Sequence, residues 1–136
     1  MDTKEKIKEK LYEIYPIEKE LSFDNLDLED KIKNQLTLEL KYWDLVQNET
    51  YKMDKLDDMM IDARFEVYDS LKFEGERTLT KAEIDDVYLP ADKKIKHIKS
   101  LIELQKTKLD FFKMCYNSIK QQRWTVQSYI KNNGQM

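Results

Sequence analysis

Turn residues and reactive side chains are scarce in this chain of 136 residues, which has two glycines, two prolines, one cysteine and one histidine. Strand-rich folds need a turn signal roughly every 8–12 residues, so this scarcity excludes them. Charged residues make up 38% of the chain, and Glu, Lys, Leu, Ile and Met recur at helical spacing. That composition is typical of long helices or a coiled coil. We expect one all-α domain over residues 1–136.

The side chains of most catalytic sites are missing as well. The only histidine, His97, stands in the basic run KKIKHIK, and Cys115 lies beside an apolar helical position, where we expect a packed thiol. No Cys/His metal spacing, glycine-rich phosphate loop or nucleophile elbow occurs. Four acidic residues recur at helical spacing: Asp54, Asp57, Asp58 and Asp62. They favour a solvated face, because hard cations prefer clustered loop oxygens. We expect no enzyme, no cofactor and no metal.

Long apolar runs are also missing. No stretch approaches 18 apolar residues, so no transmembrane helix is expected. The first ten residues, MDTKEKIKEK, lack the apolar core of a signal peptide. A single cysteine cannot form an intrachain disulfide. Together these features predict a soluble, intracellular protein without a membrane partner.

The few breaks divide the chain into helical segments. Pro16 ends the first segment, because proline disfavours helical geometry in the residue before it. Thr80 and Glu83 form a capping box, which predicts a helix start, and Pro90 suits the start of the next helix. Gly75 suits a helix C-cap. The predicted elements are a short helix and connector over 1–27 (helix 3–15, connector 17–27), a long helix over 28–72, a short helix over 81–88 and a second long helix over 91–132.

Apolar residues mark the packing faces of the two long helices. The second helix has two sets at heptad spacing: Ile95, Ile102, Leu109, Tyr116, Arg123 and Ile130, and Ile98, Gln105, Phe112, Ile119 and Val126. The face of the first helix begins with Ile32, Leu36, Leu40, Trp43 and Val46 and continues through Met53, Met60 and Val67. Such narrow seams are typical of a coiled coil, and the short connector between the two helices makes a long antiparallel hairpin the simplest arrangement. The side chains off the second seam are Leu101, Leu104, Phe111 and Met114, and we expect self-association to cover them.

Charge is distributed unevenly along the chain. Residues 1–90 carry 14 basic and 24 acidic side chains, whereas residues 91–136 carry 10 basic and 3 acidic ones. This asymmetry indicates a polyanion partner, self-association or both. Nearly all basic residues of the second helix lie off its apolar seam, so they can neutralise phosphates, with an affinity that falls steeply with salt. Alternatively, they pair with the acidic first helix. Trp124 and Tyr129 lie outside the seam and can stack on bases or form an oligomer contact.

Several short motifs follow one another along the second half of the chain. They are Ala91-Asp92-Lys93, Leu109-Asp110-Phe111 and Ile119-Lys120 with Arg123, preceded upstream by MIDARFE (residues 60–66) and Tyr68. In order, spacing and total length, residues 89–130 resemble the C-terminal region of the UvsY family of phage recombination mediators.

This resemblance implies a protein of DNA recombination and repair in the cytoplasm of an infected host cell. It implies a homo-oligomeric ring of six or seven helical subunits that binds single-stranded DNA, and as protein partners a RecA-like phage recombinase and the single-strand-binding protein. The family's DNA contact region includes the position of Arg64. Because Asp62 nearby is acidic, we expect DNA contact chiefly on the second helix. The expected nucleic-acid-binding residues are Arg64, Lys93, Lys94, Lys96, Lys99, Lys120 and Arg123. The alternative is a coiled-coil adaptor or assembly factor without nucleic-acid binding.

Overall fold

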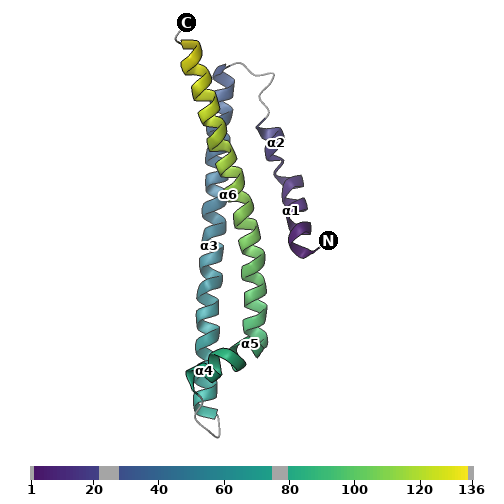
Figure 1. Cartoon of the computed structure of the whole chain (residues 1–136), viewed down its shortest axis with the longest axis vertical. Helices are drawn as coiled ribbons and strands as arrows, with labels where there is room; N and C mark the ends of the chain where they lie inside the picture. The colour runs from purple at the N-terminus through teal and green to yellow at the C-terminus, as the bar shows by residue number, and fades with distance from the viewer. Residues whose placement is uncertain (1, 22–27, 75–79, 135–136) are drawn as a thin grey trace. The chain divides into compact units, whose positions relative to one another are not determined.

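The computed structural model describes residues 2–21, 28–74 and 80–134, and these residues are helical almost throughout. In chain order the elements are α1 (Thr3–Ile14), α2 (Ile17–Glu20), α3 (Leu28–Glu74), α4 (Lys81–Glu83), the π-helical turn η1 (Ile84–Tyr88), α5 (Leu89–Ala91) and α6 (Lys93–Gly134) (Figure 1). The predicted all-α fold is confirmed for these residues. Helix α2 lies in the segment that was predicted to be a connector. The proposed C-cap Gly75 lies outside the described residues.

The helices form two compact units, which we treat separately. Unit 1 contains Met1–Thr50 and Thr107–Met136, and unit 2 contains Tyr51–Lys106. Both long helices contribute to both units. In each unit the segment of α3 packs antiparallel against the segment of α6, as the predicted hairpin requires (Figure 1).

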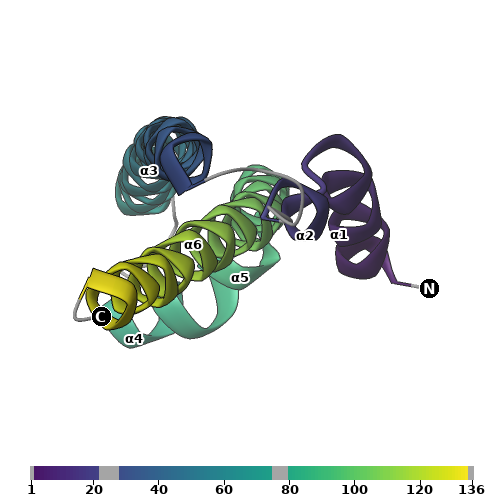
Figure 2. The ribbon, with the colours of Figure 1, turned by 90° about the horizontal axis from the view of Figure 1, so that it is seen from above.

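The core of unit 1 forms where α1 and α2 pack beside α6 (Figure 2). Its buried side chains are Leu11, Ile17, Tyr42, Phe111, Phe112, Cys115 and Ile119. The rings of Tyr12 and Phe111 meet edge to face with centroids 5.0 Å apart, and those of Tyr15 and Phe112 do the same at 5.0 Å. Phe111 was expected to need a second subunit. Helix α1 of the same chain covers it instead.

The first half of α3 turns a mixed face toward this core, where Leu38, Leu45 and Val46 pack. Gln35, Tyr42 and Glu49 are buried, whereas the predicted face of Ile32, Leu36, Leu40 and Trp43 is exposed. Hydrogen bonds reduce the cost of burying these polar groups. The Gln35 Nε2 donates to the carbonyl of Ile119 at 2.6 Å. The prediction was therefore wrong for the four exposed residues, whereas Val46 packs against the core and Met60 farther along α3 is buried, as predicted.

The short helices of unit 2 pack on both long helices. Ile84 of η1 and Leu89 of α5 are buried with Met60, Ala63, Ile95 and Ile98. The predicted cap is confirmed, because the Thr80 Oγ1 accepts a hydrogen bond from the Glu83 N–H at 3.2 Å. Pro90 has no N–H to donate to the carbonyl four residues earlier, which favours the wider π-helical turn before it. That turn places Ile84 and Leu89, five residues apart, on the same side.

The seam of α6 agrees with the heptad prediction over most of its length. Ile95, Ile98, Leu109, Phe112 and Ile119 are buried. The side chains of Val126 and Ile130 lie outside the described residues. Along the segments that the structure describes, no helix is long and apolar enough to cross a membrane.

Candidate nucleic-acid interface

A hollow of about 820 Å³ opens on unit 2 between α3, the short helices and α6. Three basic side chains from three different helices line it: Arg64 of α3, Lys81 of α4 and Lys99 of α6. Arg64 follows the buried Met60 by four residues, and Lys99 follows the buried Ile95 by the same step. Residues four apart lie on neighbouring helical turns of one face, so each cation lies beside a buried apolar side chain. We call this feature the basic hollow.

Positive charge exceeds negative charge in the basic hollow. Two acidic side chains, Asp57 and Asp85, line it together with the three cations. The Tyr68 hydroxyl donates a hydrogen bond to the Asp85 carboxylate, and this bond raises the pKa of the Tyr68 phenol. Among the described residues, none forms an ion pair with Arg64, Lys81 or Lys99. Their donors are therefore available to an anionic ligand.

Aromatic surface lies next to these cations. Tyr68 lines the basic hollow and is half-buried, and Phe65, the neighbour of Arg64, has 65% of its surface exposed. Proteins that bind single strands combine basic grooves with rings on which bases stack. The basic hollow contains both components, since Tyr68 lines it together with the three cations.

The other predicted lysines of unit 2 lie elsewhere. The Lys94 Nζ is 3.0 Å from a Glu66 carboxylate oxygen, and the two residues line a separate hollow of about 300 Å³. Lys93 and Lys96 are exposed near the start of α6 and line neither of these hollows. Of the four predicted lysines at this end of α6, the structure brings Lys99 together with Arg64.

The two predicted residues of unit 1 differ in their surroundings. The Arg123 Nη1 lies 2.6 Å from the Glu39 Oε1, and the Glu39 side chain is only 15% exposed. This ion pair ties α6 to α3. Lys120 is exposed, and its Nζ lies 4.5 Å from the centroid of the Tyr116 ring, a cation–π contact. Trp124, four residues after Lys120, is exposed on the same face of α6.

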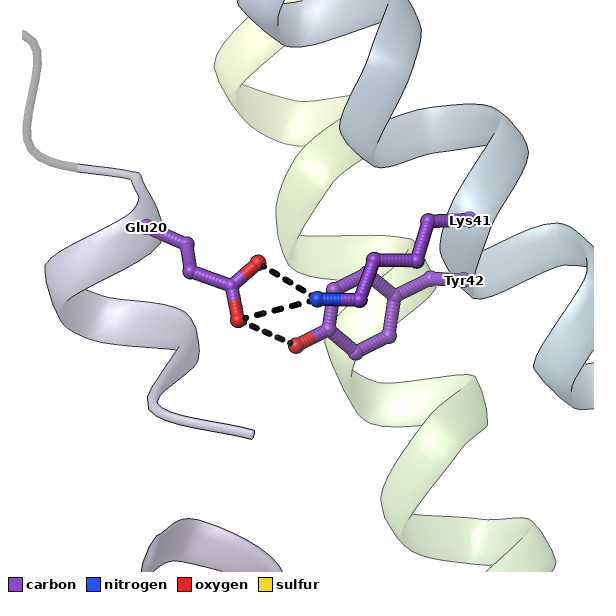
Figure 3. Close-up of polar contacts among 3 residues, drawn as sticks. All are labelled: Glu20, Lys41 and Tyr42. Atoms are coloured by element: carbon purple, nitrogen blue, oxygen red, sulfur yellow. Dashed lines mark hydrogen bonds and ion pairs between the residues drawn. The ribbon is translucent and has the colours of Figure 1, made fainter. Parts of the chain in front are cut away.

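The most perturbed polar groups of unit 1 have a structural role. The Tyr42 hydroxyl donates to the Glu20 carboxylate at 3.0 Å, and the Lys41 Nζ lies 3.3 and 3.5 Å from the two oxygens of Glu20 (Figure 3). Burial, followed by the charge of Glu20, raises the pKa of Tyr42 and raises the pKa of the Cys115 thiol to about 12. Cys115 is fully buried, as predicted. The thiolate is the nucleophilic form, so this protonated thiol is suited to packing.

The four acidic residues that recur at helical spacing in the sequence lie on the surface. Asp54, Asp57, Asp58 and Asp62 are exposed along α3. Within the described segments, no three His, Cys, Asp or Glu side chains come together as metal ligands.

Sequence reasoning missed Lys81 as a member of the basic hollow. The capping box places Lys81 at a helix start, but it does not show which way the helix faces. That direction depends on Ile84 and Leu89, which share a face only because η1 is a π-helical turn. The convergence of Lys81 with Arg64 and Lys99 is thus a tertiary feature.

Comparison of the chain with protein-family models, with curated proteins and with solved structures gives no match.

Proposed function

We propose that the protein binds single-stranded DNA through the basic hollow and acts as a recombination mediator. In that role it helps a RecA-like recombinase replace the single-strand-binding protein on DNA. The observation that carries the proposal is the convergence of Arg64, Lys81 and Lys99 without an ion pair among the described residues. The mediator role is supported by the resemblance of residues 89–130 to the UvsY family.

The proposed mechanism makes and breaks no covalent bond. The guanidinium of Arg64 can hold a phosphate through two parallel hydrogen bonds, while Lys81 and Lys99 act as point charges. Bases then stack on Phe65 or Tyr68. Each subunit contributes few contacts, but their repetition in a homo-oligomer of six or seven subunits gives high avidity. A strand held in this way is loosened from its coating protein and presented to the recombinase.

A coiled-coil adaptor without nucleic-acid binding is the second candidate. Ion pairs favour it, because part of the basic charge of α6 is used within the hairpin. The pairs are Lys94 with Glu66 at 3.0 Å, Lys108 with Glu49 at 3.4 Å and Arg123 with Glu39 at 2.6 Å. These pairs leave the basic hollow unchanged, so DNA binding separates the two candidates.

The binding test uses fluorescence anisotropy of a labelled single-stranded oligonucleotide, titrated at several salt concentrations. We expect measurable binding at 50 mM salt and a steep loss of affinity as salt rises. The double variant R64E/K99E should weaken binding at 50 mM salt at least tenfold. It should also reduce the slope of log K against log salt by about 0.7 for each lost phosphate contact.

The matched control is Lys55→Glu, a charge reversal on the same helix α3 in unit 2. Lys55 lies over the Tyr51 ring and outside the basic hollow. We expect its affinity to change less than about threefold, since only the general field is altered. No binding by the wild type at 50 mM salt, or an equal loss in K55E, contradicts the proposed DNA site.

The mediator role has a separate test. A recombinase is added to DNA coated with fluorescent single-strand-binding protein, and release of the label is followed. The wild-type protein should accelerate release, and R64E/K99E should not. DNA binding without acceleration contradicts the mediator role and leaves the DNA site standing.

A further inference from the structure

A row of large apolar side chains faces solvent on the first half of α3, in unit 1. Ile32, Leu36, Leu40 and Trp43 follow one another at steps of four, four and three residues, so they share one helix face. Their exposed fractions are 37%, 53%, 66% and 46%. We call this row the α3 stripe. It spans about 16 Å along the helix, at about 1.5 Å per residue.

The α3 stripe is on the side of the helix away from the core. The side turned inward contains the buried Gln35, Tyr42 and Glu49. Leu38, Leu45 and Val46 also pack against the core on the inward side. The first half of α3 therefore has apolar side chains on two sides, and the α3 stripe is the side that faces solvent. A helix of a globular protein normally buries its apolar side chains, so the stripe is an uncovered apolar face. A contiguous apolar row on a surface is characteristic of an interaction site.

Charges beside the α3 stripe indicate what covers it. Lys33 follows Ile32 and Asp44 follows Trp43, so opposite charges flank the same side of the stripe near its two ends. When two identical helices pair antiparallel, this flank of one helix meets the same flank of the other with its ends reversed. Lys33 of each copy then lies beside Asp44 of the second copy. Parallel pairing would instead place this flank against the opposite flank of the second copy, so Lys33 would not meet Asp44.

The apolar pattern has the same antiparallel symmetry. Reversing the helix aligns Ile32 with Trp43 and Leu36 with Leu40, about a twofold axis near residue 38. Glu39 is close to this axis, but its carboxylate is already paired with Arg123 at 2.6 Å. Lys33 now pairs with Glu29 at 3.4 Å, with both side chains largely exposed. Such a surface pair is weak, so Lys33 is free to turn toward Asp44 of a second copy.

We propose that the α3 stripe is a self-association surface on which two copies pair antiparallel about a twofold axis. The pairing rests on the proposed homo-oligomer and deepens it, but it requires no DNA. A twofold contact uses the same patch on both subunits, so every subunit engaged through it belongs to a pair. Of the two expected subunit numbers, six is compatible with complete pairing and seven is not.

Cysteine cross-linking tests the antiparallel register. Thr37 and Asn48 are both exposed on the flank that contains Lys33 and Asp44. In the proposed pair the two copies of Thr37 lie within about 3 Å of each other along the helix axis, whereas those of Asn48 are separated by about 30 Å. With a short thiol-to-thiol reagent, we expect Thr37→Cys to give a covalent dimer and Asn48→Cys to give none. The wild type is the blank, because Cys115 is buried.

Charge exchange tests the same register without a reagent. Lys33→Asp and Asp44→Lys should each weaken self-association severalfold in sedimentation, and the double variant K33D/D44K should restore it. Leu36→Glu should abolish pairing, while Met59→Glu, an exposed site on α3 outside the stripe, should not.

Three results overturn the proposal: no cross-link in Thr37→Cys, an equal cross-link in Asn48→Cys, or no recovery in the double variant. When Thr37→Cys is introduced into R64E/K99E, the variant expected to lose DNA binding, the covalent dimer should still form. Failure of the DNA site and failure of the pairing are therefore distinguishable.

Discussion

At the scale of single residues, the polar contacts of unit 1 hold the N-terminal helices in place. Tyr42→Phe removes the hydroxyl that bonds to Glu20, whose carboxylate then keeps only Lys41. A hydrogen bond to a charged group contributes about 1.5–3 kcal/mol, so we expect the free energy of unfolding to fall by about that amount. Urea unfolding followed by circular dichroism measures it.

The control for this substitution is Tyr51→Phe. The Tyr51 ring is exposed, and its loss of a hydroxyl should change stability by less than about 0.5 kcal/mol. An equal effect of the two substitutions would show that the bond to Glu20 contributes nothing specific.

At the scale of elements, α6 begins at an acidic cap. The Asp92 Oδ1 accepts a hydrogen bond from the Ile95 N–H at 2.9 Å. Asp92→Ala leaves this N–H without its side-chain acceptor and should lower the free energy of unfolding by about 1 kcal/mol. Amide hydrogen exchange at Ile95 should become faster in the same variant.

Asp92→Asn keeps a side-chain acceptor and is the matched control. Asparagine and aspartate cap helices about equally well. Asp92→Asn should therefore lower the free energy of unfolding only by the charge–dipole contribution, about 0.3–1 kcal/mol. Stability lost equally in both variants would assign the effect to charge and not to the cap.

Helix positions could be predicted from the sequence because their signals are local. Pro16 and the Thr80–Glu83 cap act on their immediate neighbours, and the heptads of α6 correctly identify Ile98 and Phe112 as buried. The inward face of α3 was predicted only in part: Val46 packs against the core as predicted, but the pattern that includes Leu36 was chosen over the side on which Gln35 is buried. Gln35 is buried there through a bond to the carbonyl of Ile119, a partner 84 residues away. The spacing of apolar residues along a helix does not indicate a hydrogen bond between residues so far apart in the sequence.

The candidate interface was predicted only in part, for the same reason. Arg64 followed from the family resemblance and Lys99 from the basic run of the second helix. Their meeting with Lys81 depends on how the short helices fold back, which spacing does not define. Sequence likewise could not separate Lys99 from Lys94, which pairs with Glu66 across the hairpin.

At the scale of the whole molecule, stability should decrease at alkaline pH. The pKa of Cys115 is raised to about 12, and that of Tyr42 is also raised, in both cases chiefly by burial. The unfolded chain loses these protons near pH 9 and pH 10, while the folded protein keeps them. Because the unfolded state then binds fewer protons, the free energy of unfolding falls as pH rises above about 9. Below that pH the contribution is fully present.

Urea unfolding at pH values from about 8 to 10.5 measures this decline. Each group contributes at most about 1.4 kcal/mol per pH unit, the limit for one proton. The double variant C115A/Y42F should show a shallower decline than the wild type, although it is less stable at pH 8. Parallel curves for the two proteins would contradict the assignment to these buried groups.

The two tryptophans of the chain, Trp43 and Trp124, are both exposed in unit 1, and unit 2 contains none. Intrinsic tryptophan emission therefore reports on the surface of unit 1 alone, whereas the circular dichroism signal sums the helices of both units. Coincident transitions by the two methods would show that the units unfold together. Separate midpoints would mean that each unit has its own cooperative transition.

Trp43 belongs to the α3 stripe, so dilution of a paired protein should shift its emission toward that of water-exposed indole.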